Sequence, residues 1–210
     1  MPVGQTVRRL FGRHEARISE LYRGLFVNVD AFVATVKGWV PEATNVLEVG
    51  CGEGAVTQRL AASYPHAAIL GIDITPRLGR LYSGRREGVR FEQTNVQEVA
   101  ASRPGQFDLI ILADVLHHVP EDLRKVLLDS IRTLLAPEGR FVLKEWERTR
   151  SPIYWMGYLS DRWITGDRIR YMPRDELACR IQGSFGAGAA VAEARIAPWR
   201  NNLATLVAHD

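Results

Sequence analysis

Short apolar runs alternate with amphipathic stretches along most of the chain beyond residue 44. The apolar runs predict five strands, at residues 45–49, 68–72, 89–92, 107–113 and 139–145. The stretches between them predict helices at residues 54–63, 76–86 and 121–135. Strands that are apolar along their whole length and separated by helices are typical of a mostly parallel sheet with helices on both faces.

The pattern differs at the two ends of the chain. Apolar residues at helical spacing predict two helices within residues 5–38. Residues 189–197 and 203–208 are predicted as strands, and their short link PWRNN fits a hairpin, which makes them antiparallel. We therefore expect an α/β fold with a doubly wound, Rossmann-like sheet of seven strands. The sheet is mostly parallel and ends in an antiparallel C-terminal strand.

A glycine-rich turn follows the first predicted strand. Residues 46–55 read VLEVGCGEGA, so Gly50, Gly52 and Gly54 lie between a strand and a helix. Glycine lets the backbone turn sharply and approach a ligand, and ligands of such sheets bind beyond the carboxyl ends of the strands. Asp73 ends the second strand, where a carboxylate suits ribose hydroxyls. This pattern predicts a nucleotide-like ligand, and it leaves a nicotinamide cofactor and S-adenosylmethionine both open.

Four further features separate these two cofactors. Glu48 precedes the glycines to give E-x-G-x-G-x-G, Asn95 follows the third strand, ADVLHHVP ends the fourth and LLAPEGRFVLKE opens the fifth. In this order they resemble the class I S-adenosylmethionine-dependent methyltransferases over residues 44–147. No Tyr-x-x-x-Lys pair occurs, which argues against short-chain dehydrogenase chemistry.

The resemblance implies S-adenosylmethionine as the cofactor and assigns one group of residues to its methionine end. Glu48 is expected to act indirectly, by holding the amino group or the loop, and the Ala113 carbonyl is expected to accept from the ammonium. Gly50, Gly52 and the backbone near Cys51 are expected to line the methionine end, and Gly54 is a further cofactor-binding residue of the same loop. We expect Cys51 to be a small filler without thiol chemistry.

A second group of residues is assigned to the nucleoside end of the cofactor. The resemblance implies that Asp73 binds the ribose hydroxyls, that Ile74 packs on the adenine, and that Asn95 and Val96 flank the other adenine edge. Asn95 departs from the family, which usually has Asp here. Its amide oxygen can still accept a hydrogen bond from the adenine amino group.

Candidate bases follow the fourth strand, where the methyl group is expected to point. Histidine titrates near neutral pH, and His117 is our candidate base, with Glu145 on the neighbouring strand as its partner. This arrangement resembles the His–Glu pair of carbon-methylating polyketide synthase domains. We expect His118 to pack under the following helix. Asp114 could imitate part of a catechol-type metal site, but the Asp-Asn pair of that site is missing, so no metal is predicted.

Residues 151–172 are unusually rich in large apolar side chains. They follow the fifth strand, so we expect them to lie over the active site as the wall of an apolar or aromatic acceptor pocket. A helix packed on the N-terminal helices is the other interpretation. The predicted acceptor contacts are Tyr154, Trp155, Tyr158 and Trp163.

The domain organisation follows from these elements. We expect residues 1–210 to form a single methyltransferase domain. Its parts are a helical cap at residues 1–40, the cofactor-binding core at 44–147, substrate-lid helices at 151–183 and a C-terminal strand pair at 187–210.

Composition limits the kinds of partner that the chain is expected to bind. The chain has 210 residues and a formal net charge of +3, carried mostly by dispersed arginines, so no nucleic acid is expected to bind. Neither a signal peptide nor a membrane-spanning run is expected, and two cysteines suit a reducing, cytoplasmic compartment. A homodimer remains open.

The predicted function is O- or C-methylation of an aromatic, polyketide-like or lipid-like small molecule. A macromolecule methyltransferase and a non-catalytic cofactor-binding subunit are the alternatives. The Asn/Asp-Pro-Pro-Tyr motif is missing after the fourth strand, which disfavours the first of them.

Overall fold

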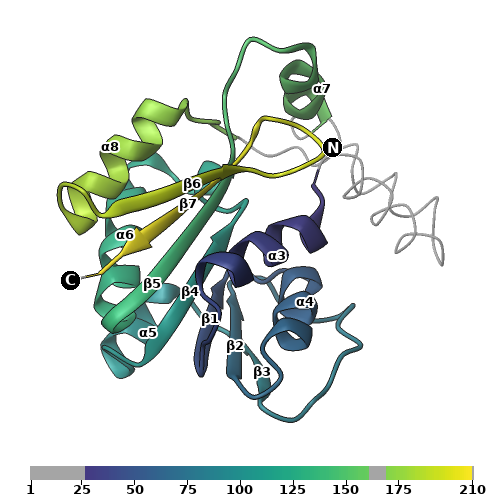
Figure 1. Ribbon diagram of the computed structural model, residues 1–210, viewed down its shortest axis with the longest axis vertical. Helices are drawn as coiled ribbons and strands as arrows, with labels where there is room; N and C mark the ends of the chain where they lie inside the picture. Colours follow the sequence, from purple (N-terminus) through teal and green to yellow (C-terminus); the bar gives the residue numbers. More distant parts are fainter. Residues whose placement is uncertain (1–26, 161–168, 210) are drawn as a thin grey trace.

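One seven-stranded sheet forms the centre of the protein (Figure 1). The computed structural model describes residues 27–160 and 169–209. The strands are β1 (Asn45–Val49), β2 (Ala68–Asp73), β3 (Val89–Gln93), β4 (Phe107–Ala113), β5 (Leu135–Trp146), β6 (Ala190–Arg195) and β7 (Asn202–Ala208). Their order is β3-β2-β1-β4-β5-β7-β6. Strands β1 to β5 are parallel, and β7 is antiparallel to both of its neighbours, which confirms the predicted sheet.

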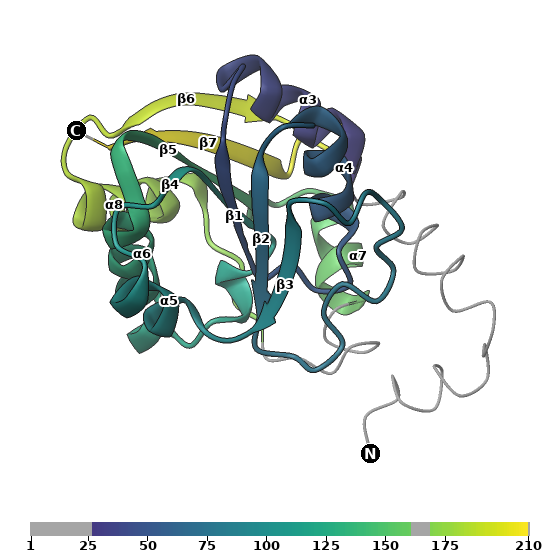
Figure 2. The ribbon, with the colours of Figure 1, turned by 90° about the horizontal axis from the view of Figure 1, so that it is seen from below.

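Helices cover both faces of the sheet (Figure 2). They are α3 (Val29–Trp39), α4 (Ala55–Ser63), α5 (Val96–Ser102), α6 (Glu121–Leu134), α7 (Pro152–Ser160) and α8 (Arg174–Phe185). Helices α3 and α4 pack together on one face, whereas α6 lies between α5 and α8 on the other. Helix α7 lies apart, beyond the carboxyl end of β5 (Figure 1).

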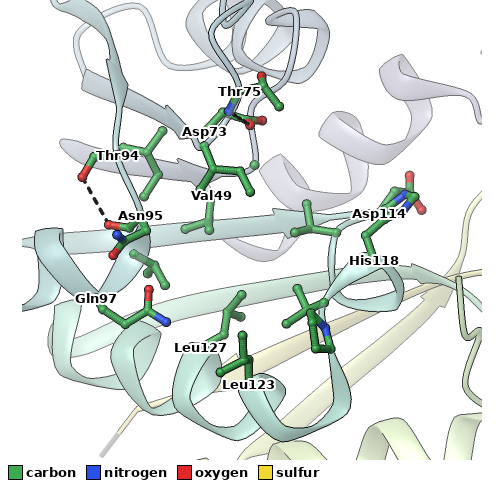
Figure 3. A pocket seen from close by; sticks show the side chains of 17 residues that line it. Val49, Asp73, Thr75, Thr94, Asn95, Gln97, Asp114, His118, Leu123 and Leu127 are labelled. Carbon is green, nitrogen blue, oxygen red and sulfur yellow. Dashed lines mark hydrogen bonds between the residues drawn. The ribbon is translucent and has the colours of Figure 1, made fainter. Parts of the chain in front are cut away.

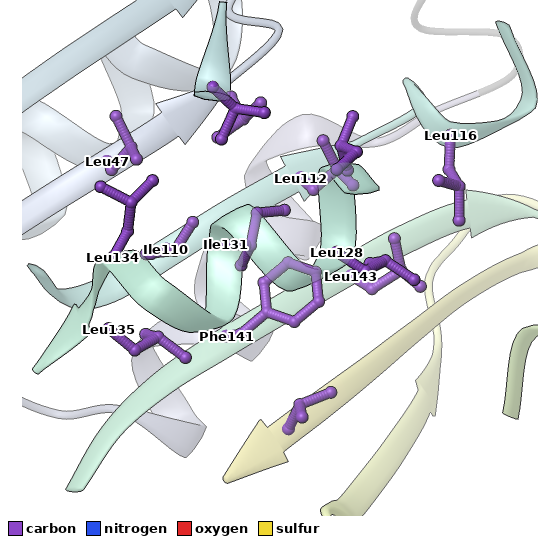
Figure 4. Packing of buried hydrophobic residues seen from close by; sticks show 14 of the residues in the cluster. Leu47, Ile110, Leu112, Leu116, Leu128, Ile131, Leu134, Leu135, Phe141 and Leu143 are labelled. Atoms are coloured by element: carbon purple, nitrogen blue, oxygen red, sulfur yellow. The ribbon is translucent and has the colours of Figure 1, made fainter. Parts of the chain in front are cut away.

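Both faces of the central strands are buried. Along β4, Leu109 and Ile111 pack with α3 and α4, whereas Ile110 and Leu112 pack with α6. Figure 4 shows the second of these cores, in which Ile131 of α6 lies over the strands. Because successive side chains of a strand point to opposite faces, two covered faces require a strand that is apolar throughout. This is why the strands appear in the sequence as uninterrupted apolar runs.

The predicted helix at residues 76–86 is wrong, because this segment consists of turns. Gly79 has a φ of +62°, and a Cβ there would lie 2.8 Å from the ring of Phe91. The amide groups of Gly79 and Leu81 donate to the carbonyls of Gly52 (2.8 Å) and Glu53 (3.0 Å) instead of forming helical hydrogen bonds. The segment therefore braces the glycine loop. Helix α5, in contrast, was not predicted.

The predicted lid at residues 151–183 divides into two parts. Leu177 and Ile181 of α8 belong to the core beside α6, so this helix covers the sheet and not the active site. What remains for a lid is α7 and the residues that follow it, of which 161–168, including Trp163, lie outside the described residues. Most of the predicted helical cap at residues 1–40 also lies outside them, and α3 is its described part.

Candidate active site

Two adjoining cavities lie at the carboxyl ends of β1, β2 and β4, where the strand order reverses and such sheets bind their ligands. The larger, drawn in Figure 3, measures about 490 Å³, and its lining includes Asp73, Ile74, Asn95, Val96 and His118. The smaller measures about 170 Å³, and its lining includes Phe32, Glu48, Cys51, Gly52, Ala113 and Lys144. Gly50 and Asp114 line both cavities. All the predicted cofactor residues except Gly54 line one of these cavities, whereas a Cβ on Gly54 would meet Tyr82, Gly79 and Phe91.

The glycine loop is held in a conformation that favours glycine. Gly50, Gly52 and Gly54 have φ values of +75°, +48° and +91°. The amide groups of Gly50 and Cys51 both donate to the Ile72 carbonyl, at 2.8 and 3.0 Å, which anchors the loop to β2. A Cβ on Gly50 would lie 2.4 Å from Val115, whereas a Cβ on Gly52 would meet nothing within 4 Å. The loop is therefore packed against Val115 at Gly50 and has open space at Gly52, where it can hold a ligand.

Asp73 joins this loop to the end of β2. Its Oδ2 accepts from the Gly52 amide at 2.8 Å, and its Oδ1 accepts from the Thr75 amide at 2.9 Å. Beside it, Ile74 is 75% exposed although it is large and apolar. A carboxylate next to an uncovered apolar side chain fits the sugar and base of a nucleoside.

Asn95 has a structural role that the sequence interpretation overlooked. Its Oδ1 accepts from the Glu98 amide at 2.9 Å and caps the N-terminus of α5. The oxygen predicted to meet the adenine amino group is therefore already engaged, and only its second lone pair remains. Val96 is buried at the start of the helix.

Glu48 is buried beneath the glycine loop. It is 3% exposed, and its carboxyl accepts from the Thr57 hydroxyl. Burial raises its pKa from 4.5 to about 8, against the opposing effect of the Thr57 hydrogen bond. Burial and the Glu48 carboxylate also raise the pKa of the Cys51 thiol far above its ordinary value. Since the thiolate is the reactive form, this direction agrees with the expectation that Cys51 has no thiol chemistry, which stays a prediction.

The raised pKa of Glu48 leads to a first prediction, on stability. Between about pH 4.5 and 8 the folded chain binds a proton that the unfolded chain has lost, so Glu48 makes the protein progressively less stable as pH rises through this window. Glu48→Gln removes the titration. We expect its free energy of unfolding, relative to wild type, to rise from pH 5 to 8 by up to several kcal/mol, since one pKa unit equals about 1.4 kcal/mol.

Urea denaturation at pH 5, 6.5 and 8 measures this difference. Glu42→Gln, at an exposed carboxyl group, is the matched control. A Glu48→Gln difference that stays constant across the three pH values would contradict the prediction.

Glu145 and His117 meet as predicted. The Nδ1 atom of His117 lies 2.7 Å from Glu145 Oε2, and both side chains are at most 5% exposed. The other carboxylate oxygen of Glu145 accepts from the amides of Val115 (3.1 Å) and Leu116 (2.7 Å). Glu145 on β5 therefore fixes both the imidazole and the turn that carries it.

His118 differs from the prediction that it packs under the helix. Residues Leu116–His118 form a short 3-10 helix, in which neighbouring side chains point about 120° apart. With His117 turned inward to Glu145, His118 is exposed and lines the larger cavity (Figure 3).

Aromatic side chains connect α7 to this pair. Tyr154 is buried, and its ring centroid lies 5.9 Å from that of Tyr171, which lies 4.8 Å from that of His117. Trp155 and Tyr158 contact Tyr154, and Trp155 is 56% exposed. The sequence interpretation missed Tyr171, although it belongs to the same aromatic-rich run.

An ion pair between a buried lysine and a partly exposed aspartate was also missed. Lys144 of β5 is completely buried, and its Nζ lies 2.7 and 2.6 Å from the two carboxylate oxygens of Asp114. Asp114 has a φ of +57°, in the left-handed region, and its amide donates to the Lys144 carbonyl at 2.8 Å. The signal in the sequence was a lysine inside the apolar run FVLKE. We refer to these residues as the Asp114–Lys144 pair.

Within residues 27–160 and 169–209, no cluster of three or more His, Cys, Asp or Glu side chains is placed to hold a metal ion. No helix in the same part of the chain has the length and apolar character needed to span a membrane.

Comparison with known proteins identifies relatives of the central part of the chain. Residues 47–141 match the family model of a methyltransferase domain. A ubiquinone biosynthesis O-methyltransferase of Bordetella parapertussis is 33% identical over 116 residues, covering 50% of this chain and 46% of that protein. A trans-aconitate 2-methyltransferase of Methylobacterium nodulans is 41% identical over 96 residues, covering 45% and 35%. The matches span less than half the length of either relative.

Solved structures share the fold of nearly the whole chain. The 1,6-didemethyltoxoflavin-N1-methyltransferase of Burkholderia thailandensis, solved with bound S-adenosylhomocysteine, covers 99% of this chain and 89% of its own at 20% identity and a TM-score of 0.70. The N-methyltransferase NodS of Bradyrhizobium japonicum is 21% identical, covers 80% and 86%, and has a TM-score of 0.58. Residues 47–141, which carry the glycine loop within this fold, therefore form a methyltransferase domain.

Proposed function

We propose that the chain methylates a small-molecule acceptor at oxygen or carbon, with His117 as the general base. The observation that carries this proposal is the 2.7 Å contact between His117 Nδ1 and Glu145. When bound, S-adenosylmethionine supplies a methyl group that is already activated on a sulfonium. The chain then has to align the acceptor and remove its proton.

The two cavities fit this cofactor. Open space above Gly52 leaves room for the methionine part, and Glu48 lies beneath the same loop. Asp73 and the uncovered Ile74 face the larger cavity and suit the ribose and the adenine. With its oxygen capping α5, Asn95 is better suited to shape the adenine edge than to bind it strongly.

The histidine is held in the form that a base needs. Donation from Nδ1–H to Glu145 leaves Nε2 as the nitrogen that takes a proton, and the carboxylate stabilises the imidazolium that results. A hydroxyl group or a carbon acid must lose a proton on methylation, whereas a neutral amine can react first. An arrangement built to accept a proton therefore favours oxygen or carbon as the methylated atom.

The acceptor side is apolar and aromatic. Trp155 and Met156 of α7 are 56% and 46% exposed, and the buried Tyr154 and Tyr171 connect this helix to His117. Ligand pockets are lined mostly by such side chains. An aromatic, polyketide-like or lipid-like acceptor fits this wall, and the relatives named above support a small molecule in general.

The acceptor is identified by mass spectrometry of a metabolite extract incubated with the protein and S-adenosylmethionine. We expect a metabolite to gain one methyl group. Radiolabelled transfer to RNA or protein, with no labelled metabolite, would favour the macromolecule alternative. Cofactor binding without transfer to any of the three would favour a non-catalytic subunit.

A prediction on α7 separates acceptor binding from packing. Trp155 is mostly exposed, so Trp155→Ala is expected to raise the acceptor KM several-fold while the cofactor Kd and the melting temperature stay nearly constant. Tyr154→Ala is the contrasting variant on the same helix, because it empties a buried site and is expected to cost about 3 kcal/mol of stability. Trp155→Ala with an unchanged acceptor KM would remove α7 from the pocket.

A further inference from the structure

The Asp114–Lys144 pair lies where the two cavities meet. Asp114 and Gly50 are the residues common to both linings. In S-adenosylmethionine the sulfonium joins the adenosyl part to the methionine part. A cofactor that fills both cavities therefore brings its sulfonium to the junction, where Asp114 lies.

The pair is a dipole with a defined direction. Lys144 lines the smaller cavity but its side chain is 0% exposed, whereas the Asp114 side chain is 34% exposed and Asp114 lines both cavities. Its negative end therefore points to the junction. A fixed dipole of this kind stabilises a positive charge in front of it without having to reorganise.

Two contacts from Lys144 hold Asp114 in place. The ammonium binds both carboxylate oxygens, and the Lys144 carbonyl accepts from the Asp114 amide. Asp114 needs this support because a left-handed conformation costs a non-glycine residue about 1–2 kcal/mol. Strained residues of this kind cluster at functional sites.

We propose that Asp114, held by Lys144 as a positioning residue, recognises the positive charge of S-adenosylmethionine. The pair makes the site prefer the methyl donor, with its sulfonium, over the product S-adenosylhomocysteine, whose sulfur carries no charge. Transfer of the methyl group removes the charge and weakens the hold on the product. This inference concerns the cofactor and does not depend on the acceptor or on His117.

Titration calorimetry with the two cofactor forms tests the proposal. Asp114→Asn alone leaves a buried ammonium without its counter-charge and is prone to misfold. The main variant is therefore Lys144→Met/Asp114→Asn, which removes both charges and keeps similar shapes. We expect its Kd for S-adenosylmethionine to rise about tenfold, equivalent to about 1.4 kcal/mol, and its Kd for S-adenosylhomocysteine to change much less.

Two further variants complete the test. Lys125→Met/Asp129→Asn removes an exposed ion pair on α6 and is expected to leave the ratio of the two Kd values unchanged. Lys144→Met alone keeps the Asp114 carboxylate but removes the ammonium that holds it in place. This variant is expected to reduce the preference for S-adenosylmethionine by a smaller factor. A stronger preference in Lys144→Met would show that Lys144 only neutralises Asp114 and would overturn its positioning role.

The main variant has its own contrary outcomes. An equal rise in the Kd values of both cofactor forms would mean that the carboxylate lies at the methionine ammonium, which both forms carry. This result would overturn the proposal. So would a lower melting temperature with an unchanged Kd ratio, which indicates a purely structural pair.

Discussion

His117→Ala is expected to lower turnover by about 10²–10⁴ and to leave the cofactor Kd nearly unchanged. The imidazole is the group proposed to take the acceptor proton. It is buried against Glu145 and lines neither of the two cavities, so its loss is expected to leave cofactor binding intact. Glu145→Gln should fall between wild type and His117→Ala. Its amide oxygen can still accept from Val115 and Leu116, but it no longer stabilises an imidazolium.

The measurements are single-turnover rates across pH and cofactor titration at one pH. Wild-type turnover is expected to lose activity on the acidic side, as His117 becomes protonated, and His117→Ala is expected to lack this dependence. His66→Ala, at an exposed position before β2, is the matched histidine control. Unchanged turnover in His117→Ala would mean that the enzyme works by alignment alone, and the assignment of oxygen or carbon would fall with the base.

His118→Ala provides a second comparison. Because this side chain is exposed and lines the larger cavity, the variant is expected to change the cofactor Kd more than the rate of transfer. The adjacent histidines thus separate cofactor binding from proton transfer.

The strand positions and the glycine loop could be predicted from the sequence because they depend on local patterns. A buried parallel strand needs apolar residues on both sides, as Leu109 and Ile110 of β4 illustrate, so its position is visible in the residues themselves. The Glu145–His117 contact was also predictable, since the carboxyl ends of neighbouring parallel strands meet at one edge.

The errors arose where tertiary contacts decide the outcome. Residues 76–86 have helical spacing, but Gly79 fits only against the ring of Phe91, and its amide donates to the glycine loop. The partners of the Asp114–Lys144 pair are 30 residues apart, and the lysine in the run FVLKE indicated a buried cation without indicating which carboxylate it meets. Which of two adjacent histidines turns inward likewise depends on Glu145, on another strand.

Gly52→Val is expected to weaken cofactor binding by at least about 100-fold, or about 2.8 kcal/mol, while the protein still folds. A Cβ at this position meets nothing within 4 Å, so the new side chain enters the space proposed for the methionine part of the cofactor and disturbs no protein contact. The Gly52 amide can keep its hydrogen bond to Asp73. The remaining cost is the left-handed φ of +48°, which is about 1–2 kcal/mol for a residue with a side chain.

Gly188→Val is the control that isolates this cost. Gly188 has a φ of +83° and also has nothing within 4 Å of a Cβ, but it lies between α8 and β6, away from both cavities. Urea denaturation is expected to show a similar loss of stability in the two variants, and calorimetry with S-adenosylmethionine a loss of affinity in Gly52→Val alone. Gly52→Ala should be intermediate, because a methyl group fills less of the space. Binding by Gly52→Val within a few-fold of wild type would show that the cofactor does not approach the loop at Gly52, and its methionine part would then have to lie elsewhere along the carboxyl ends of β1 and β4.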